Sequence, residues 1–219
     1  MKYHIEFDLD FKRNDTKGIF IAIEGNDGSG KTTQAELLTQ KLSKNRTVFL
    51  TKNPTDGEIG KFIRKVLSRE IVVPAVSFQY LFSADRQVQQ VEIIERLQKG
   101  EVVITDRYFW SALAYGMVDR GAVNADNAYR LLVSQAILSM YHQFIIPDYT
   151  FFLDISVETS LKRLSSMNKK KELYEEEEKL KSINQAYKWL INQFPKEITV
   201  VDGEKSIEEI TEGIAGKVT

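Results

Sequence analysis

The sequence predicts an α/β fold of three layers, in which helices cover both faces of a five-stranded parallel sheet. Five short runs rich in β-branched and aromatic residues alternate with longer segments of helical periodicity, which is the pattern of a parallel sheet. The chain has 219 residues, of which 42% are hydrophobic, and this length suits one full core rather than two. We expect one domain over residues 18–219, preceded by an extension over residues 1–17.

Five runs in the sequence are expected to form the strands. Each is short and bounded by polar residues or segments of helical period. The runs are Ile19–Glu24, Thr47–Thr51, Val102–Thr105, Thr150–Asp154 and Ile198–Val201. Ligands of parallel sheets bind beyond the carboxyl ends of the strands. Because residues with binding chemistry follow the first three runs directly, we expect the binding site at that edge of the sheet.

The first seventeen residues stand outside this plan. From Ile5 to Phe11 apolar residues alternate with acidic ones, which is the period of a half-buried strand. Such a segment can add to a sheet edge, pair with a partner subunit or dock as an arm. A structural role is favoured over a functional one.

A phosphate-binding loop joins the first expected strand to the first expected helix. From Gly25 to Thr32 it reads G-x-x-x-x-G-K-T, the pattern of the P-loop. Glycines let successive backbone N–H groups face one anion, and the positive end of the following helix adds to the attraction. Lys31 is expected to reach the β- and γ-phosphates of a nucleoside triphosphate, and the Thr32 hydroxyl to bind Mg²⁺. The sequence therefore predicts a P-loop NTPase type of fold, the alternative being a chance match in a glycine-rich turn.

An acid and an arginine follow the third expected strand. The carboxylate of Asp106 is expected to hold Mg²⁺ opposite the Thr32 hydroxyl, although a helix N-cap is the alternative. Arg107, Ser111 and Tyr115 recur at four-residue spacing, so a helix that began here would carry them on one face. The planar guanidinium of Arg107 suits a phosphate gripped at two points, and a structural salt bridge is the competing interpretation.

An aromatic ring and a second arginine lie on a segment of helical period. Phe82 and Arg86 are one turn apart, so both could project toward a planar ligand with polar edges, such as a nucleobase. Taken alone, such a pair is more often a core ring beside a surface arginine.

Composition excludes several classes of function. The formal charge of −1 gives no reason to expect a nucleic acid polymer or an anionic membrane as a partner. No apolar stretch approaches the roughly 20 residues of a membrane span. The chain has no cysteine and two histidines, so a metal is expected to arrive with the nucleotide. A reducing cytoplasm is the expected compartment.

Taken together, these motifs resemble those of the thymidylate kinase family, enzymes that phosphorylate dTMP to dTDP with ATP. The resemblance runs from about Ile19 to the C-terminal helix and rests on five groups of residues in the family's order. The groups are Phe20–Gly25 leading into Asp27 and Gly30–Gln34; Glu58–Gly60 with Ile63 and Arg64; Leu81–Arg86; Asp106–Tyr108 with Ser111, Ala114 and Tyr115; and Pro147 and Asp148 before Thr150–Asp154.

The resemblance implies a role for each motif residue. ATP would be bound by Gly25, Asn26, Asp27, Gly28, Ser29, Gly30, Lys31, Thr32, Thr33 and Arg163. The acceptor dTMP would be bound by Asp27, Lys52, Pro54, Phe82, Arg86, Arg107, Ser111 and Tyr115. Lys31, Asp27, Arg107 and Lys52 would be the catalytic residues, with Mg²⁺ held by Thr32 and Asp106. The resemblance also implies a homodimer and a place in dTTP biosynthesis.

Three departures from the family pattern concern the lid and the acceptor site. The P-loop contains no arginine, so a lid over about residues 165–174 is expected to supply the cation. The candidates there are Lys169, Lys170 and Lys171, which lack the guanidinium fork, and a solvated charge run is the alternative. Gly116 stands where bacterial relatives often have Gln, and Asn53 where many have Glu or Phe, so a base or sugar contact of the family is expected to be absent.

Two other classes of function are weighed against a thymidylate kinase. A kinase for another nucleoside monophosphate or for a deoxynucleoside would share the P-loop and lid, but a hydroxyl acceptor needs a base. A P-loop switch that hydrolyses a nucleoside triphosphate is less favoured, because the sequence has no Asn-Lys-x-Asp motif for reading guanine.

Overall fold

The computed structural model describes residues 10–167 and 172–218. Its strands are β1 (Ile19–Gly25), β2 (Val48–Lys52), β3 (Val102–Asp106), β4 (Tyr149–Asp154) and β5 (Thr199–Asp202). Its helices are α1 (Lys31–Leu42), α2 (Glu58–Leu67), α3 (Ala75–Gln98), α4 (Phe109–Asp119), α5 (Asn127–Leu138), α6 (Val157–Ser166), α7 (Glu177–Gln193) and α8 (Ile207–Ala215). Each expected strand is present, with ends that differ by at most one residue from the prediction.

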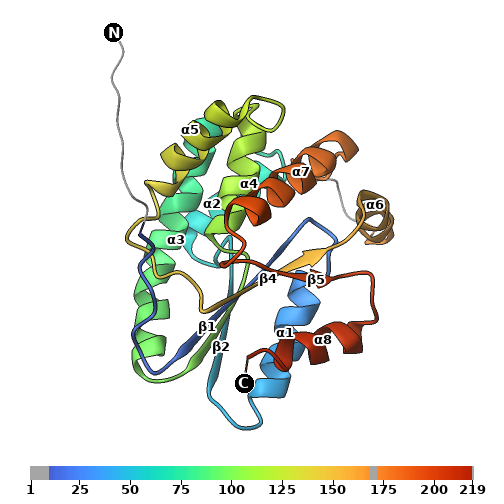
Figure 1. Cartoon of the computed structure of the whole chain (residues 1–219). Helices are drawn as coiled ribbons and strands as arrows, with labels where there is room; N and C mark the ends of the chain where they lie inside the picture. Colours follow the sequence, from blue (N-terminus) through green and yellow to red (C-terminus); the bar gives the residue numbers. More distant parts are fainter. Residues whose placement is uncertain (1–9, 168–171, 219) are drawn as a thin grey trace.

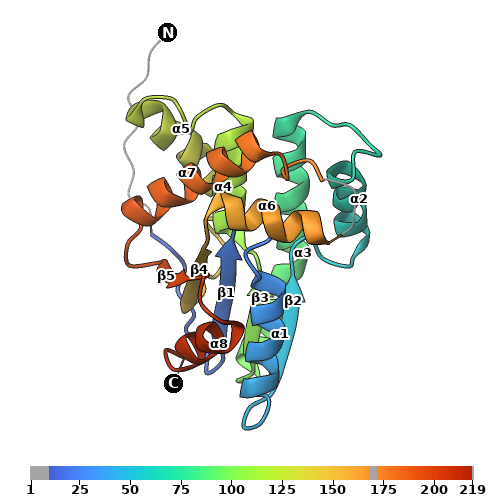
Figure 2. The same ribbon diagram turned by 90° about the vertical axis from the view of Figure 1, so that its right-hand side faces the viewer.

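The five strands form one parallel sheet in the order β2-β3-β1-β4-β5. As Figures 1 and 2 show, helices lie on both sides of this sheet. The predicted three-layer α/β fold is therefore confirmed. Because β1 occupies the centre, the loop that follows it emerges between the ends of β3 and β4.

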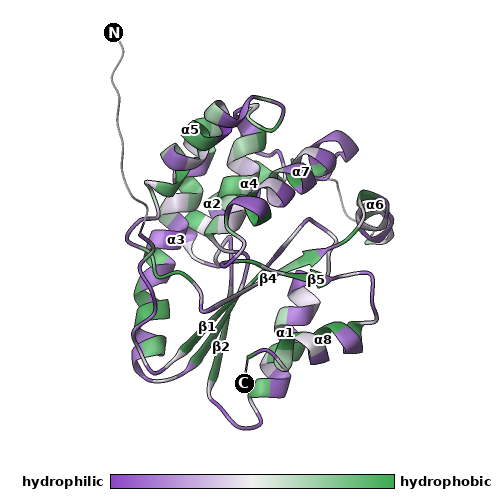
Figure 3. Ribbon diagram, in the orientation of Figure 1, coloured by the Kyte–Doolittle hydropathy of each residue, from purple (hydrophilic) through white to green (hydrophobic). Residues whose placement is uncertain are grey.

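Alternate residues of the strands build two separate cores. On one face Phe20 and Ala22 of β1 pack in the larger core, with side chains of α3, α4, α5 and α7. On the other face Ile21 and Ile23 pack with α1 and α8. Side chains of a strand alternate between its two faces, so a central strand covered on both sides is apolar throughout. Figure 3 shows this pattern as green strands beneath helices that carry both hydrophobic and hydrophilic residues.

The described part of the N-terminal segment docks as an arm. Lys12 makes a single parallel bridge with Ile145, and no longer strand forms over residues 10–17. The ring of Phe11 packs on Phe109, Trp110 and Phe194, with ring centroids 5.9–6.1 Å apart. The rest of the alternating segment, residues 5–9, lies outside the described residues.

The end of α3 approaches the start of β1 so closely that only glycine fits there. The backbone N–H of Gly18 donates to the Leu97 carbonyl at 3.1 Å, and that of Ile19 donates to the Glu101 carbonyl at 3.2 Å. A Cβ atom at Gly18 would lie 2.6 Å from the Glu101 oxygen and 2.7 Å from the Leu97 Cα. These neighbours are backbone atoms, so they cannot move away as a flexible side chain would.

We therefore expect Gly18→Ala to lower the free energy of unfolding by about 1–3 kcal/mol through overpacking. The matched control is Gly213→Ala on α8, where an added Cβ meets nothing within 4 Å. That change should raise stability by up to about 1 kcal/mol, because alanine is the better helix former. Urea unfolding of both variants measures the difference, and equal stabilities would contradict the assignment of a close contact at Gly18.

Candidate active site

The P-loop has the conformation that anion binding requires. It runs from the end of β1 to the start of α1, and Gly28 and Gly30 have φ values of 79° and 91°. The Lys31 side chain folds back over the loop, where its Nζ donates to the Asn26 carbonyl at 2.7 Å. Burial, together with the nearby charge of Arg107, lowers the pKa of Lys31 to about 8. An anionic ligand in this loop would stabilise the charged form of the lysine.

Thr32 and Asp106 meet across the sheet edge. Thr32 Oγ1 donates to Asp106 Oδ2 at 2.5 Å, and the other carboxylate oxygen is buried without a partner among the described residues. Asp106 is not a helix N-cap, because α4 starts after Tyr108. Within residues 10–167 and 172–218, no group of three or more acidic or histidine side chains could hold a metal ion. A hydroxyl and a free carboxylate oxygen suit Mg²⁺, which takes its other ligands from water and phosphates.

Arg107 connects the P-loop to α4. Its guanidinium pairs with the Asp27 carboxylate, donates to the Gly25 carbonyl at 3.0 Å and donates to Ser111 Oγ at 3.1 Å. It also lies 5.2 Å from the centre of the Tyr115 ring. Arg107, Ser111 and Tyr115 thus lie together as expected, although α4 begins only at Phe109.

The backbone of Arg107 explains that later helix start. Its φ is 73°, in the left-handed region that non-glycine residues rarely adopt. Its N–H donates to the Ile23 carbonyl of β1 at 2.9 Å. The residue therefore extends the contact between β3 and β1 before the chain turns into α4, and this turn directs the guanidinium back toward the P-loop.

Asp27 is held as a carboxylate. Burial raises its pKa, but the charges of Arg107 and Lys31 outweigh this effect, so the pKa lies below its usual value. Its second oxygen accepts a hydrogen bond from the Tyr115 hydroxyl at 3.2 Å. The P-loop acid therefore positions both an arginine and an aromatic ring beside the phosphate cradle.

A small cavity of about 120 Å³ opens next to this ion pair. Its lining includes seven of the eight residues expected to bind the acceptor, namely Asp27, Pro54, Phe82, Arg86, Arg107, Ser111 and Tyr115. Arg86 is 2% exposed, lies 5.2 Å from the centre of the Phe82 ring and donates to the Tyr141 hydroxyl at 3.3 Å. Phe82 and Arg86 thus line the same cavity, and Arg86 is not a surface residue.

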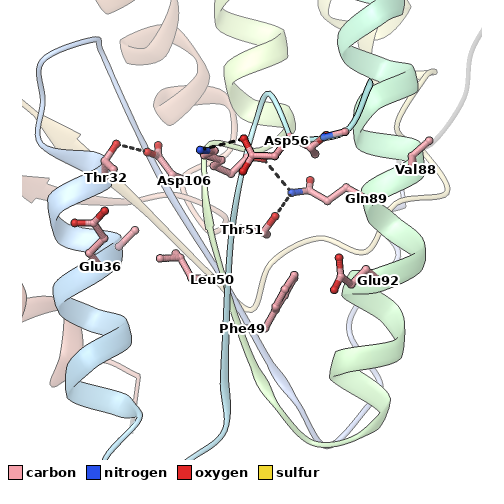
Figure 4. A pocket seen from close by; sticks show the side chains of 14 residues that line it. Thr32, Glu36, Phe49, Leu50, Thr51, Asp56, Val88, Gln89, Glu92 and Asp106 are labelled. Atoms are coloured by element: carbon pink, nitrogen blue, oxygen red, sulfur yellow. Dashed lines mark hydrogen bonds and ion pairs between the residues drawn. The ribbon is translucent and has the colours of Figure 1, made fainter. Parts of the chain in front are cut away.

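Lys52 is the eighth expected residue, and it lines a different cavity. This larger cavity, of about 570 Å³, lies between α1 and α3 beside β2 and also includes Thr32 and Asp106 (Figure 4). The Lys52 ammonium pairs with Asp56 Oδ1 at 3.3 Å, and about half of its side chain is exposed. The structure therefore brings Lys52 to the edge of the site at Thr32 and Asp106, and not into the smaller cavity.

Glu24 is an important site residue that our sequence analysis did not assign. It is fully buried, and its carboxylate accepts from the N–H groups of Tyr108 and Ser111 at 2.9 and 3.2 Å. It also accepts from the hydroxyls of Ser111 and Tyr187 at 2.5 and 2.9 Å. Burial is the main reason that its pKa is raised. A buried acid needs such partners. The signal in the sequence was the presence of an acid in an otherwise apolar central strand.

Arg163 contacts the P-loop, and the end of the expected lid contacts Tyr115. Arg163 of α6 donates to the carbonyls of Gly28 and Ser29, both at 3.4 Å. Of the expected lid, residues 168–171, with Lys169, Lys170 and Lys171, lie outside the described residues. Just after them, the Tyr174 ring packs edge-on against Tyr115, with centroids 4.8 Å apart.

The chain matches the family model described as thymidylate kinase over residues 23–214. A probable thymidylate kinase of Pyrococcus horikoshii is 37% identical over 209 residues, covering 92% of this chain and 96% of that protein. One of Thermococcus gammatolerans is 36% identical over 211 residues, with the same coverage. A thymidylate kinase of Leptospira borgpetersenii is 34% identical over 201 residues, covering 90% and 91%.

Within the described residues, no helix combines the length and apolar character needed to cross a bilayer.

The fold is also similar to a solved structure. A thymidylate kinase of Candida albicans superimposes with a TM-score of 0.77 at 28% identity, covering 92% of this chain and 91% of that one. The family model and these relatives together show that the chain belongs to the thymidylate kinase family.

Proposed function

We propose that this protein phosphorylates dTMP to dTDP with ATP and Mg²⁺, as a step of dTTP biosynthesis in the cytoplasm. One observation carries the proposal beyond family membership. The Arg107–Asp27 ion pair joins the phosphate cradle to a cavity that contains an aromatic ring and a buried arginine. A donor nucleotide in the cradle and an acceptor in the cavity would then meet at Arg107.

The donor side consists of the P-loop and the positive end of α1. Lys31 would leave the Asn26 carbonyl and contact the β- and γ-phosphates, where its charge offsets the charge that develops during transfer. Arg163 lies over the loop at Gly28 and Ser29 and would contact the nucleotide from α6.

Mg²⁺ fits the pair formed by Thr32 and Asp106. When bound, the ion would supply positive charge that neutralises the triphosphate. The Thr32 hydroxyl would turn from Asp106 to bind the ion, and the free Asp106 oxygen would hold one of its waters. Lys52, which lines the same cavity edge, would grip the acceptor phosphate only after leaving Asp56.

The acceptor side consists of the smaller cavity. Arg107 would exchange its contact with Asp27 for the acceptor phosphate, which it can hold at two points. Phe82 would stack on the base and Arg86 would donate to its edge, while Tyr115 would occupy the space beside C2′ of the sugar. The acceptor phosphate oxygen is already a nucleophile, so positioning and charge neutralisation accelerate transfer without a general base.

A homodimer is proposed as part of this function, as the resemblance implies. The support is a stripe on α3 that we call the α3 stripe, consisting of Val76, Tyr80, Val88 and Val91. These side chains are 45–65% exposed and recur at spacings of four, eight and three residues, so they share one helix face. A second copy of the chain packed on this stripe would remove it from water.

The first prediction tests the reaction itself. Across the natural nucleoside monophosphates and thymidine, we expect dTMP to be the best acceptor and a diphosphate to be the product. Lys31→Ala should leave a folded protein whose kcat falls by roughly 10³ or more, because a charge on the transferring phosphoryl group is lost. A coupled assay measures both, and a wild-type preference for thymidine, for a purine monophosphate or for hydrolysis alone would overturn the proposal.

The second prediction concerns the acceptor phosphate. Arg107→Lys keeps the charge but loses the fork, so kcat/KM for dTMP should fall by a factor that corresponds to about 2 kcal/mol or more. ATP binding, measured by calorimetry, should change little. If ATP affinity collapses while dTMP use survives, Arg107 serves the donor side instead.

The third prediction concerns the α3 stripe. The double variant Val88→Asp, Val91→Asp should sediment as a monomer, because burying two carboxylates in an apolar interface is costly. The matched control is Leu131→Asp on α5, a residue that is 46% exposed and lies outside the stripe. That variant should keep the mass of a dimer, and a dimeric double variant would place the interface elsewhere.

A further inference from the structure

A buried amide on α3 lines the small cavity and has an unused acceptor. Gln79 is 1% exposed and belongs to the cavity wall with Phe82 and Arg86. Its Nε2 donates to Asp119 Oδ2 at 3.2 Å, while its Oε1 has no partner among the described residues. Leaving a buried carbonyl oxygen without a hydrogen bond costs free energy. A ligand that donated a hydrogen bond to Oε1 would remove this cost.

The orientation of this amide is fixed by its neighbours. A carboxylate can only accept hydrogen bonds, so the NH₂ group of Gln79 must face Asp119 and the carbonyl oxygen must face away. Asp119 is itself held, because Oδ2 also accepts from the Tyr174 hydroxyl at 2.7 Å. The acceptor of Gln79 is therefore set in place by Asp119 of α4 and by Tyr174 at the end of the expected lid.

Gly116 makes room for the amide on the neighbouring helix. A Cβ atom at this position would lie 2.6 Å from Ile137 Cδ1 and 3.3 Å from Gln79 Cδ, so a side chain here would require these neighbours to shift. Relatives that carry a polar side chain at this position would fill the space from α4. In this chain the space is filled by Gln79 from α3 and by Ile137 from α5.

Gln79 and Arg86 together offer a donor beside an acceptor. They stand seven residues apart, two turns of α3, with Phe82 between them on the same face. The buried Nε of Arg86 also has no partner among the described residues. The 4-oxo pyrimidines thymine and uracil present the complementary pattern, an acceptor O4 beside a donor N3–H. Cytosine presents the reverse.

We propose that Gln79 is a specificity-determining residue, whose Oε1 accepts the N3–H of a 4-oxo pyrimidine base stacked on Phe82. This proposal rests on the proposed function, since it requires dTMP in the smaller cavity. It assigns the choice of thymine over cytosine to an oriented amide from α3, which Asp119 and Tyr174 hold in position. Arg86 supplies the donor for O4.

The test compares dTMP with 5-methyl-dCMP, which differ only at positions 3 and 4 of the ring. Gln79→Met keeps the shape of the side chain but removes the acceptor. We expect the ratio of kcat/KM values, dTMP over 5-methyl-dCMP, to fall about tenfold or more, because a buried donor loses its partner and the repulsion of cytosine N3 is relieved. N3-methyl-dTMP should be rejected by the wild type and penalised less in the variant.

Two further variants separate this role from packing. Gln90→Met removes a buried amide of the same helix, which bonds Tyr108 and Ile145 outside the smaller cavity, and it should leave the ratio unchanged. Asp119→Asn lets the Gln79 amide turn over, so it should lower the ratio about threefold or more even if Gln79→Met folds poorly. Thermal melting identifies poor folding.

The outcomes distinguish the two proposals. If wild type uses dTMP but Gln79→Met and Asp119→Asn slow dTMP and 5-methyl-dCMP equally, Gln79 only packs against Gly116 and its assignment is overturned. If wild type does not use dTMP, the proposed function fails first and the assignment fails with it. A lowered ratio in both variants with an unchanged ratio in Gln90→Met supports the assignment.

Discussion

The parallel pairing of β1 with β3 is the constraint on which the rest of the site depends. It sets Ile23 beside Asp106, so the loop after the first strand and the acid at the end of the third lie together despite some eighty residues of intervening chain. The hydrogen bond from the Arg107 N–H to the Ile23 carbonyl continues this contact by one residue. Because carboxyl ends of parallel strands share one edge of the sheet, the Thr32–Asp106 contact and the Arg107–Asp27 ion pair both follow from this single register.

Buried charged groups then determine how α4 and the P-loop are placed at this edge of the sheet. A lone carboxylate inside a protein is costly unless it is hydrogen-bonded, and Glu24 satisfies its oxygens with α4 and α7. Glu24 also positions the start of α4, because it accepts hydrogen bonds from the N–H groups of Tyr108 and Ser111. Arg107 and Asp27 offset one another in the same way, and Lys31 adds a second positive charge near Asp27.

The two cavities divide the chemistry between them. The larger one meets the sheet edge at Thr32 and Asp106, where we propose that a metal and a triphosphate bind, while the lining of the smaller one includes Arg107. The smaller cavity is connected to Tyr174, because the Tyr174 ring packs on Tyr115 and its hydroxyl donates to Asp119. A displacement of Tyr174 would therefore change the surroundings of Tyr115 and, through Asp119, of the Gln79 amide.

The sequence by itself determined the fold class, the strands to within one residue and the P-loop. These features depend on local pattern, since a buried strand is a continuous apolar run and a phosphate cradle needs glycine at set spacing. It also predicted that Phe82 would lie with Arg86, which is one turn away on α3, and that Arg107 would lie with Ser111 and Tyr115. In the second group only Ser111 and Tyr115 share a helix, because α4 begins at Phe109. Tertiary structure alone decided the left-handed backbone of Arg107, the place of Lys52 in the larger cavity, and the partners of Glu24 and Gln79. Those outcomes depend on contacts between residues distant in the chain, which no local pattern records.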